Sequence, residues 1–187
     1  MALEELMYPI GRFDPHGALP EGGVPALIES LASVPTRMRD AVAGLTGAQL
    51  DTPYRGGGWT VRQLVHHVPD SHLNAYVRMK WTVTEDAPTI KTYDEKRWSE
   101  LGDARTAPVE VSLALLTALH ARWDLFLRSL ADRDFERPLN HPDFGQLQLV
   151  TLLRLYEWHG RHHVAHVTGL RARLGWGGLG LIRPVQL

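Results

Sequence analysis

Apolar residues recur every three or four positions along four stretches of the chain, which is the period of an amphipathic helix. The first stretch runs from about Val24 to Ala43, with apolar side chains at positions 27, 31, 34, 38 and 42. The others cover about 61–83, 108–131 and 150–174, and Gly175 follows the last of them. Four long amphipathic helices with little strand signal predict an all-α four-helix bundle.

Three segments outside these helices lack the helical period. Residues 1–22 are rich in proline and glycine and predict an extended N-terminal arm. Residues 85–107 predict a long, functional loop between the second and third helices, with a short helix near 93–98. The polar segment 132–148 is compatible with a short hairpin, and the glycines at 177–180 predict a loose tail.

The second helix carries two local signals of its own. Thr60 and Gln63 fit the capping-box pattern, in which each side chain bonds the backbone N–H of the other residue. Pro69 lies inside the helical stretch and is expected to kink it.

Composition narrows the class of protein. The chain has 187 residues and a net charge of −1, which predicts one domain over residues 1–187 and disfavours a nucleic-acid partner. No apolar run approaches the roughly 20 residues of a membrane helix, and no signal peptide is evident, so we expect a cytoplasmic protein that acts on a small molecule. There is no cysteine, so a metal must be held by nitrogen or oxygen.

Seven of the ten histidines fall in two windows, at 66, 67 and 72 in the second helix and at 159, 162, 163 and 166 in the fourth. On a helical wheel, His159 and His163 lie at the centre of the apolar face, one turn and roughly 6 Å apart. A single core histidine is usually neutral and hydrogen-bonded. Two unpaired imidazoles would cost on the order of 1–3 kcal/mol each, so this pair predicts a metal site.

The remaining histidines are less clearly placed by the wheel. His162 falls near the polar side, where a solvated side chain is expected, and His166 lies at the edge of the apolar face. In the second helix the wheel puts His72 on the apolar stripe and His67 on its flank, but a kink at Pro69 would change the phase. Spacing therefore predicts one ligand from this helix and leaves open which residue supplies it.

Short motifs stand in a shared order and spacing along nearly the whole chain. They are Tyr8–Gly11, Leu50–Arg55, Gly58–Gln63, Val65–His67, Asp70–His72, Tyr93–Lys96, His120–Trp123, His141–Asp143 and Trp158–His159. Together they resemble the DinB-like superfamily, and specifically its YfiT branch of metal-dependent hydrolases.

This resemblance implies a four-helix bundle, a homodimer, and one divalent metal per subunit, zinc or nickel, held by His67, His159 and His163. The residues expected to surround these ligands are then His66, Asp70, His72, His162 and His166. Gly160 and Arg161 depart from similar sequences, which carry small or polar residues between the ligands. Gly160 is expected to weaken the helix by about 1 kcal/mol relative to alanine, and Arg161 to lie near the pocket mouth.

Three neutral imidazoles leave the ion its full charge and an open position, which is typical of a catalytic site. Such an ion activates water or a small thiol, and the resemblance implies a hydrolase or an S-transferase that uses bacillithiol or a similar thiol. The ligand faces offer no evident carboxylate base, which favours thiol chemistry. Asp70 either orients an imidazole or is a surface acid.

Two other interpretations remain open at this point. The protein could be a non-catalytic stress-response module whose helices are held together by the metal, or a metal-free scaffold that dimerises through an apolar helix face. The candidates for the substrate entrance are Tyr93, Arg97, Trp98 and His141. Of these, Trp98 is better explained as an anchor of the loop, Arg97 equally well as a solvated cation, and His141 as part of a turn.

Overall fold

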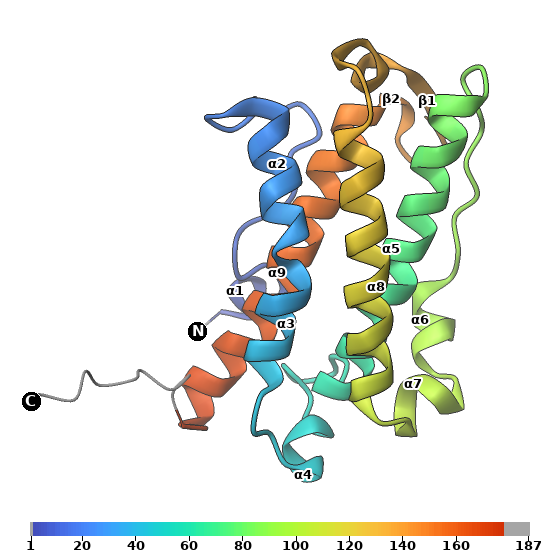
Figure 1. The fold of residues 1–187 in the computed structure, drawn as a ribbon. Coiled ribbons are helices and arrows are strands. Elements are labelled where there is room, and N and C mark those ends of the chain that lie inside the picture. The colour runs from blue at the N-terminus through green and yellow to red at the C-terminus, as the bar shows by residue number, and fades with distance from the viewer. Residues whose placement is uncertain (1, 178–187) are drawn as a thin grey trace, which may run out of the picture.

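Four columns of helix pack around one core in the computed structural model, which describes residues 2–177 (Figure 1). The columns are α2 (Gly23–Ala32) with α3 (Val34–Val42), then α5 (Val61–Thr84), α8 (Val109–Arg128) and α9 (Leu149–Leu174). The α5 helix packs on α8 and α9, and α2 and α3 pack on the same two helices from the other side. The columns therefore close a ring, and the predicted all-α bundle is confirmed.

The first column is two helices, where the sequence predicted one helix from Val24 to Ala43. The break falls at Ser33, two residues before Pro35. Proline has no backbone N–H, so residue 35 cannot donate to the carbonyl of Leu31 as a continuous helix would require. The Leu31 carbonyl is left available to a side chain from another helix.

The α5 helix begins at the predicted capping box. The Thr60 hydroxyl accepts from the Gln63 backbone N–H at 3.1 Å, and the Gln63 side chain accepts from the Thr60 N–H at 3.0 Å. The helix continues through Pro69 as one element as far as Thr84. It therefore carries both histidine-rich turns of its sequence on one continuous frame.

The connection between α5 and α8 contains two short helices, α6 (Glu95–Ser99) and α7 (Gly102–Thr106), of which the sequence predicted only the first. After the 3-10 turn Asp132–Glu136 comes the predicted hairpin, formed by β1 (Pro138–His141) and β2 (Gly145–Gln148), antiparallel with Pro138 opposite Gln148. The connection is tied to this hairpin, since the Ile90 N–H donates to the Asn140 carbonyl at 3.0 Å. The first part of the connection is thereby joined to the hairpin at one end of the bundle, whereas α6 and α7 lie at the other end, where the Gln63 side chain donates to the Ser99 carbonyl at 2.9 Å (Figure 1).

The N-terminal arm lies along α9 and includes a short helix, α1 (Leu3–Met7), that the sequence did not predict. Arg154 on α9 donates to the Asp14 carbonyl at 3.0 Å, and the rings of Phe13 and Trp158 lie 5.9 Å apart. The arm thus covers a face of α9 that would otherwise meet water. A further short helix, α4 (Gly47–Leu50), precedes α5.

The predicted tail at 177–180 lies outside the described residues apart from Gly177. In the described part of the chain, each helix is too short or too polar to cross a membrane.

Candidate metal centre

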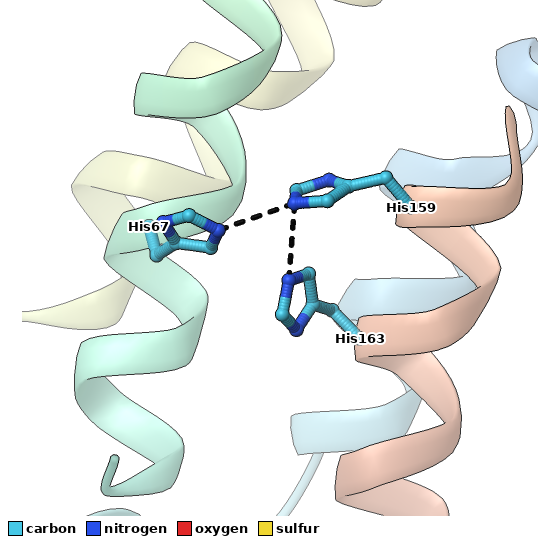
Figure 2. A group of neighbouring side chains, drawn as sticks. All are labelled: His67, His159 and His163. Carbon is cyan, nitrogen blue, oxygen red and sulfur yellow. Dashed lines mark hydrogen bonds between the residues drawn. The ribbon is translucent and has the colours of Figure 1, made fainter. Parts of the chain in front are cut away.

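Three imidazoles from two helices meet inside the bundle (Figure 2). The Nε2 atom of His159 on α9 lies 3.2 Å from Nε2 of His67 on α5 and 3.1 Å from Nε2 of His163, one turn further along α9. The three residues offer ligand atoms that all lie within 4.8 Å of one another. Nitrogen ligands about 2.0–2.1 Å from a zinc ion are roughly 3.0–3.4 Å apart, so the spacing of these atoms suits a shared ion.

A chain of hydrogen bonds fixes where His159 carries its proton. The Leu31 carbonyl can only accept, so His120 Nδ1–H donates to it at 2.9 Å. The other nitrogen of His120 then accepts from His72 Nδ1–H at 2.8 Å, and His72 Nε2 accepts from His159 Nδ1–H at 3.0 Å. Because a neutral imidazole has one N–H, the Nε2 atom of His159 presents a lone pair.

A second, shorter chain does the same for His163. The Met7 carbonyl accepts from His166 Nε2–H at 3.1 Å, so His166 Nδ1 carries a lone pair. That atom lies 3.4 Å from His163 Nδ1, which therefore holds the His163 proton. The Nε2 atom of His163 is left with a lone pair that points toward His159.

The two Nε2 lone pairs thus face each other at 3.1 Å with no proton between them. Such an arrangement is repulsive by itself, and a cation between the nitrogens removes the repulsion. Neutral imidazole nitrogens are also good ligands for zinc and other divalent first-row metals. The donor set and its protonation therefore fit a divalent metal held by His67, His159 and His163.

Burial keeps these imidazoles neutral. It lowers the pKa of His159 and of His163 well below the ordinary histidine value, and the neighbouring imidazoles lower both pKa values further. Burial lowers the pKa of His67 to about 3, with a smaller contribution from His162. Since a metal binds the unprotonated ring, the three side chains stay competent to bind through the neutral pH range.

Only some of the residues predicted to surround the three histidines lie next to them in the structure. His72, which the resemblance assigns to the surroundings of the ligands, is fully buried, and its ring lies within hydrogen-bond distance of His159. His66 points elsewhere, with its ring bonded to Ser112 Oγ at 2.7 Å and to the Ala107 carbonyl at 3.1 Å. The carboxylate of Asp70 makes no hydrogen bond to a histidine among residues 2–177, so it does not orient an imidazole there.

His162 is buried, at 7% exposure, where the helical wheel placed it toward solvent. The ring of Trp158 stacks on the His162 ring with 4.4 Å between their centroids. The ring of Tyr8, from the N-terminal arm, has its centroid 6.0 Å from that of His162. The wheel was wrong here because the arm covers this side of α9. The apolar pattern of α9 could not indicate the contact between Tyr8 and His162, because Tyr8 lies far from this helix in the sequence.

His162, His163 and His166 form a second group with ligand spacing. This group shares His163 with the first, and the proton on His163 Nδ1 is already donated to His166. An ion there would have to displace that proton. The hydrogen bonds therefore favour the group of His67, His159 and His163.

A cavity of about 480 Å³ opens onto His67, His159 and His163. Two of the predicted entrance residues, Tyr93 and His141, line it. Arg97 is exposed, and Trp98 is 41% exposed and lies outside the lining, with its ring 4.6 Å from that of Tyr93 in the same loop.

The sequence did not predict several other residues that line the cavity: Trp59, Ser71, Arg78, Thr92, Glu95, Asp143, Phe144, Tyr156 and Trp158. For Arg78 a signal existed. It follows His67 by 11 positions, which is about three helical turns and brings both residues to one face of α5.

Arg161 lies outside this lining, where the sequence analysis expected it near the pocket mouth. Its guanidinium pairs with the buried Glu157, which also accepts from Ser30 Oγ at 2.7 Å. The pair faces a separate hollow beside the N-terminal arm, lined in part by Phe13. Arg161 therefore pairs within α9, and Glu157 makes the contact between α9 and α2.

Comparison with known proteins places the chain in a family. It is 49% identical over 177 residues to "Putative metal-dependent hydrolase YfiT" of Bacillus subtilis, covering 94% of this chain and 99% of the relative. A relative from Bacillus mycoides with the same description is 49% identical over 174 residues, covering 93% of this chain and all of that protein.

The solved structure of Bacillus subtilis YfiT, described as a probable metal-dependent hydrolase with an unusual four-helix bundle topology, matches with a TM-score of 0.89 at 49% identity. The match covers 92% of this chain and 99% of that one. Residues 30–167 match the sequence pattern of the DinB superfamily, and the chain belongs to that family.

Proposed function

We propose that this protein is a metal-dependent enzyme that acts on a small molecule, with a divalent ion, zinc or nickel, held by His67, His159 and His163. The observation that carries the proposal is the convergence of three Nε2 atoms, two of them with lone pairs directed at each other by hydrogen bonds. When bound, the ion lowers the pKa of a water or thiol ligand and so supplies a nucleophile near neutral pH.

The cavity beside the histidines supports catalysis over a purely structural metal. Structural zinc sites are closed by four protein ligands, whereas catalytic sites keep a position for a reactant. Here three histidines line a space of about 480 Å³, large enough for a small substrate. The relatives named as metal-dependent hydrolases agree with this proposal.

The choice between hydrolysis and thiol transfer depends on a base. Among the described residues, neither cluster of potential metal ligands includes a carboxylate, and the two acidic residues of the cavity lining, Glu95 and Asp143, are exposed to water. His141 lines the cavity, but its Nδ1 accepts from the Asp143 backbone N–H at 3.1 Å, so its remaining nitrogen carries a proton and donates. A thiolate needs no base to attack, which favours an S-transferase that uses bacillithiol or a similar thiol.

The test is a metal and turnover assay on wild type and His159→Ala. Wild type is expected to bind one zinc or nickel ion per chain, and the variant to lose both the metal and the activity. Electrophiles are then offered with bacillithiol, with glutathione and with no thiol. Turnover only with a thiol supports the transferase, and turnover without one supports the hydrolase. Full metal binding by His159→Ala would contradict the proposed centre.

A further inference from the structure

Arg78 is a buried cation without an acidic partner. Its side chain is on α5 and the residue is 5% exposed. The guanidinium donates to the Lys91 carbonyl, from Nε at 3.1 Å and from Nη2 at 2.7 Å, and from Nη1 to the Tyr156 hydroxyl at 2.8 Å. All of these acceptors are neutral, and no carboxylate of the described residues lies within salt-bridge distance of it.

Burying the charge of Arg78 without a counter-charge destabilises the protein when no ligand is bound. Arginine stays protonated in proteins, and a buried charge without a counter-charge is unfavourable by several kcal/mol even when hydrogen bonds are present. A neutral donor at position 78 would hold the Lys91 carbonyl equally well. The charge itself is therefore the feature that needs a partner.

The guanidinium lies at the same cavity as the candidate metal centre. Arg78 lines it together with His67, His159 and His163. Tyr156 connects the two, since its hydroxyl accepts from Arg78 and its ring lies 5.8 Å from the ring of His159. Three of the five guanidinium N–H groups are used in the hydrogen bonds above, so two remain for a bound molecule.

The other polar groups of the cavity agree with an anion. The acidic residues of the lining, Glu95 and Asp143, are exposed, where water screens their charge. Trp158 Nε1 and Tyr93 Oη are buried and have no hydrogen-bond partner, although Ser71 lies near the tyrosine hydroxyl. Both groups can donate. A divalent ion and Arg78 together outweigh the charge of the two rim carboxylates.

We propose that this cavity binds a substrate or co-substrate with an oxyanion group, a carboxylate or a phosphate, that pairs with Arg78 while its reacting end lies at the three histidines. The inference rests on the proposed function, because the reacting end needs the metal. It adds the chemical class of the molecule that the enzyme takes. Arg78 acts as a binding residue, through a charge-assisted and bidentate contact.

The test compares ligands that differ only in a second anionic group. Calorimetry on the zinc-loaded protein measures binding of malonate, succinate, glutarate and adipate, each against the monocarboxylate of equal chain length, and of 3-phosphonopropionate against propionate. In wild type the second group is expected to tighten binding by about 10- to 100-fold for the chain length that fits. A gain for the dicarboxylate indicates a carboxylate substrate, and a larger gain for the phosphonate indicates a phosphate.

Arg78→Gln is expected to remove most of this gain and to leave zinc binding unchanged. Glutamine retains a donor for the Lys91 carbonyl, and Arg78→Lys provides a second variant that keeps the charge and part of the gain. The control is Arg137→Gln, because Arg137 also donates to carbonyls, those of Thr82 and Glu85, away from this cavity. It is expected to behave as wild type.

Two results separate this inference from the proposed function. Failure of the wild-type protein to bind zinc would refute the proposed function and this inference with it. Normal zinc binding with equal affinity for mono- and dianionic ligands at every chain length, or an undiminished gain in Arg78→Gln, would refute the role of Arg78 alone.

Discussion

The proton positions on the histidines are set by two backbone carbonyls that lie outside the centre. Leu31 acts on His159 through His120 and His72, and Met7 acts on His163 through His166. A carbonyl oxygen has no proton to give, so each chain can run in only one direction. The residues around the ligands thus select the tautomer that presents Nε2 to a metal, which is the usual role of such contacts.

His72→Phe is expected to weaken zinc binding by about 10- to 100-fold, because His159 loses the acceptor that keeps its proton on Nδ1. A competition assay with a coloured chelator measures the affinity. Nitrogen NMR of the metal-free protein gives a second reading, since His159 should change from one tautomer to a mixture.

The matched control is His66→Phe on the same helix. His66 is also buried, but its partners are Ser112 and the Ala107 carbonyl. This variant is expected to lose stability and keep its zinc affinity. An equal drop in affinity in both variants would show that His72 acts only through packing.

At the scale of the helices, Gly160 sets how closely α9 approaches α3. A Cβ built at Gly160 would lie 2.5 Å from Cγ2 and 3.0 Å from Cγ1 of Val34, which is fully buried. Valine is β-branched and cannot move its methyl groups aside without changing rotamer. The glycine that seemed to weaken α9 by its helix propensity is therefore required by the packing between the two helices.

Gly160→Ala is expected to lower the free energy of unfolding by about 1–3 kcal/mol, the range for overpacked cores, although propensity alone predicts a gain of about 1 kcal/mol. Urea denaturation measures the change. Adding Val34→Ala should restore part of the loss, because it removes the methyl groups that clash. A more stable Gly160→Ala protein would disprove the close contact.

The same helices show what the sequence can and cannot predict. The helical wheel predicted that His159 and His163 point inward from α9, and both line the cavity with His67, because a wheel depends only on local geometry. It failed for His162, since the cover over that residue comes from Tyr8 in the N-terminal arm. The use of the Leu31 carbonyl by His120 likewise depends on a contact between distant segments. The break at Ser33 has a local cause, Pro35, which the apolar period alone does not register.

At the scale of the whole molecule, the two chains of hydrogen bonds join every column of the bundle. Leu31 comes from α2, His72 from α5, His120 from α8 and His159 from α9, while Met7 adds the N-terminal arm. Each imidazole must be neutral for its bond to form as described. The protonation of these histidines is therefore linked to folding.

Metal-free protein is expected to lose stability as the pH falls below about 6.5, the histidine value in an unfolded chain. Burial lowers the pKa of His120 to about 4, of His162 to about 3 and of His166 to about 4. Between the two values the unfolded chain binds protons that the folded protein does not, so each group contributes a loss of up to about 1.4 kcal/mol per pH unit.

Asp70 has the opposite effect, since burial raises its pKa to about 6 and the folded protein takes up its proton at a higher pH than the unfolded chain does. This one group therefore adds stability as the pH falls, against several histidines that remove it. Urea denaturation across this pH range should thus give a constant stability above about pH 7 and a steep decline below about pH 6. His120→Gln is the control, since it removes one titrating group and should make the decline shallower by about one proton. A stability that stays level down to about pH 5 would mean that the imidazoles take up protons in the fold as readily as in the unfolded chain, which would contradict the lowering of their pKa values by burial.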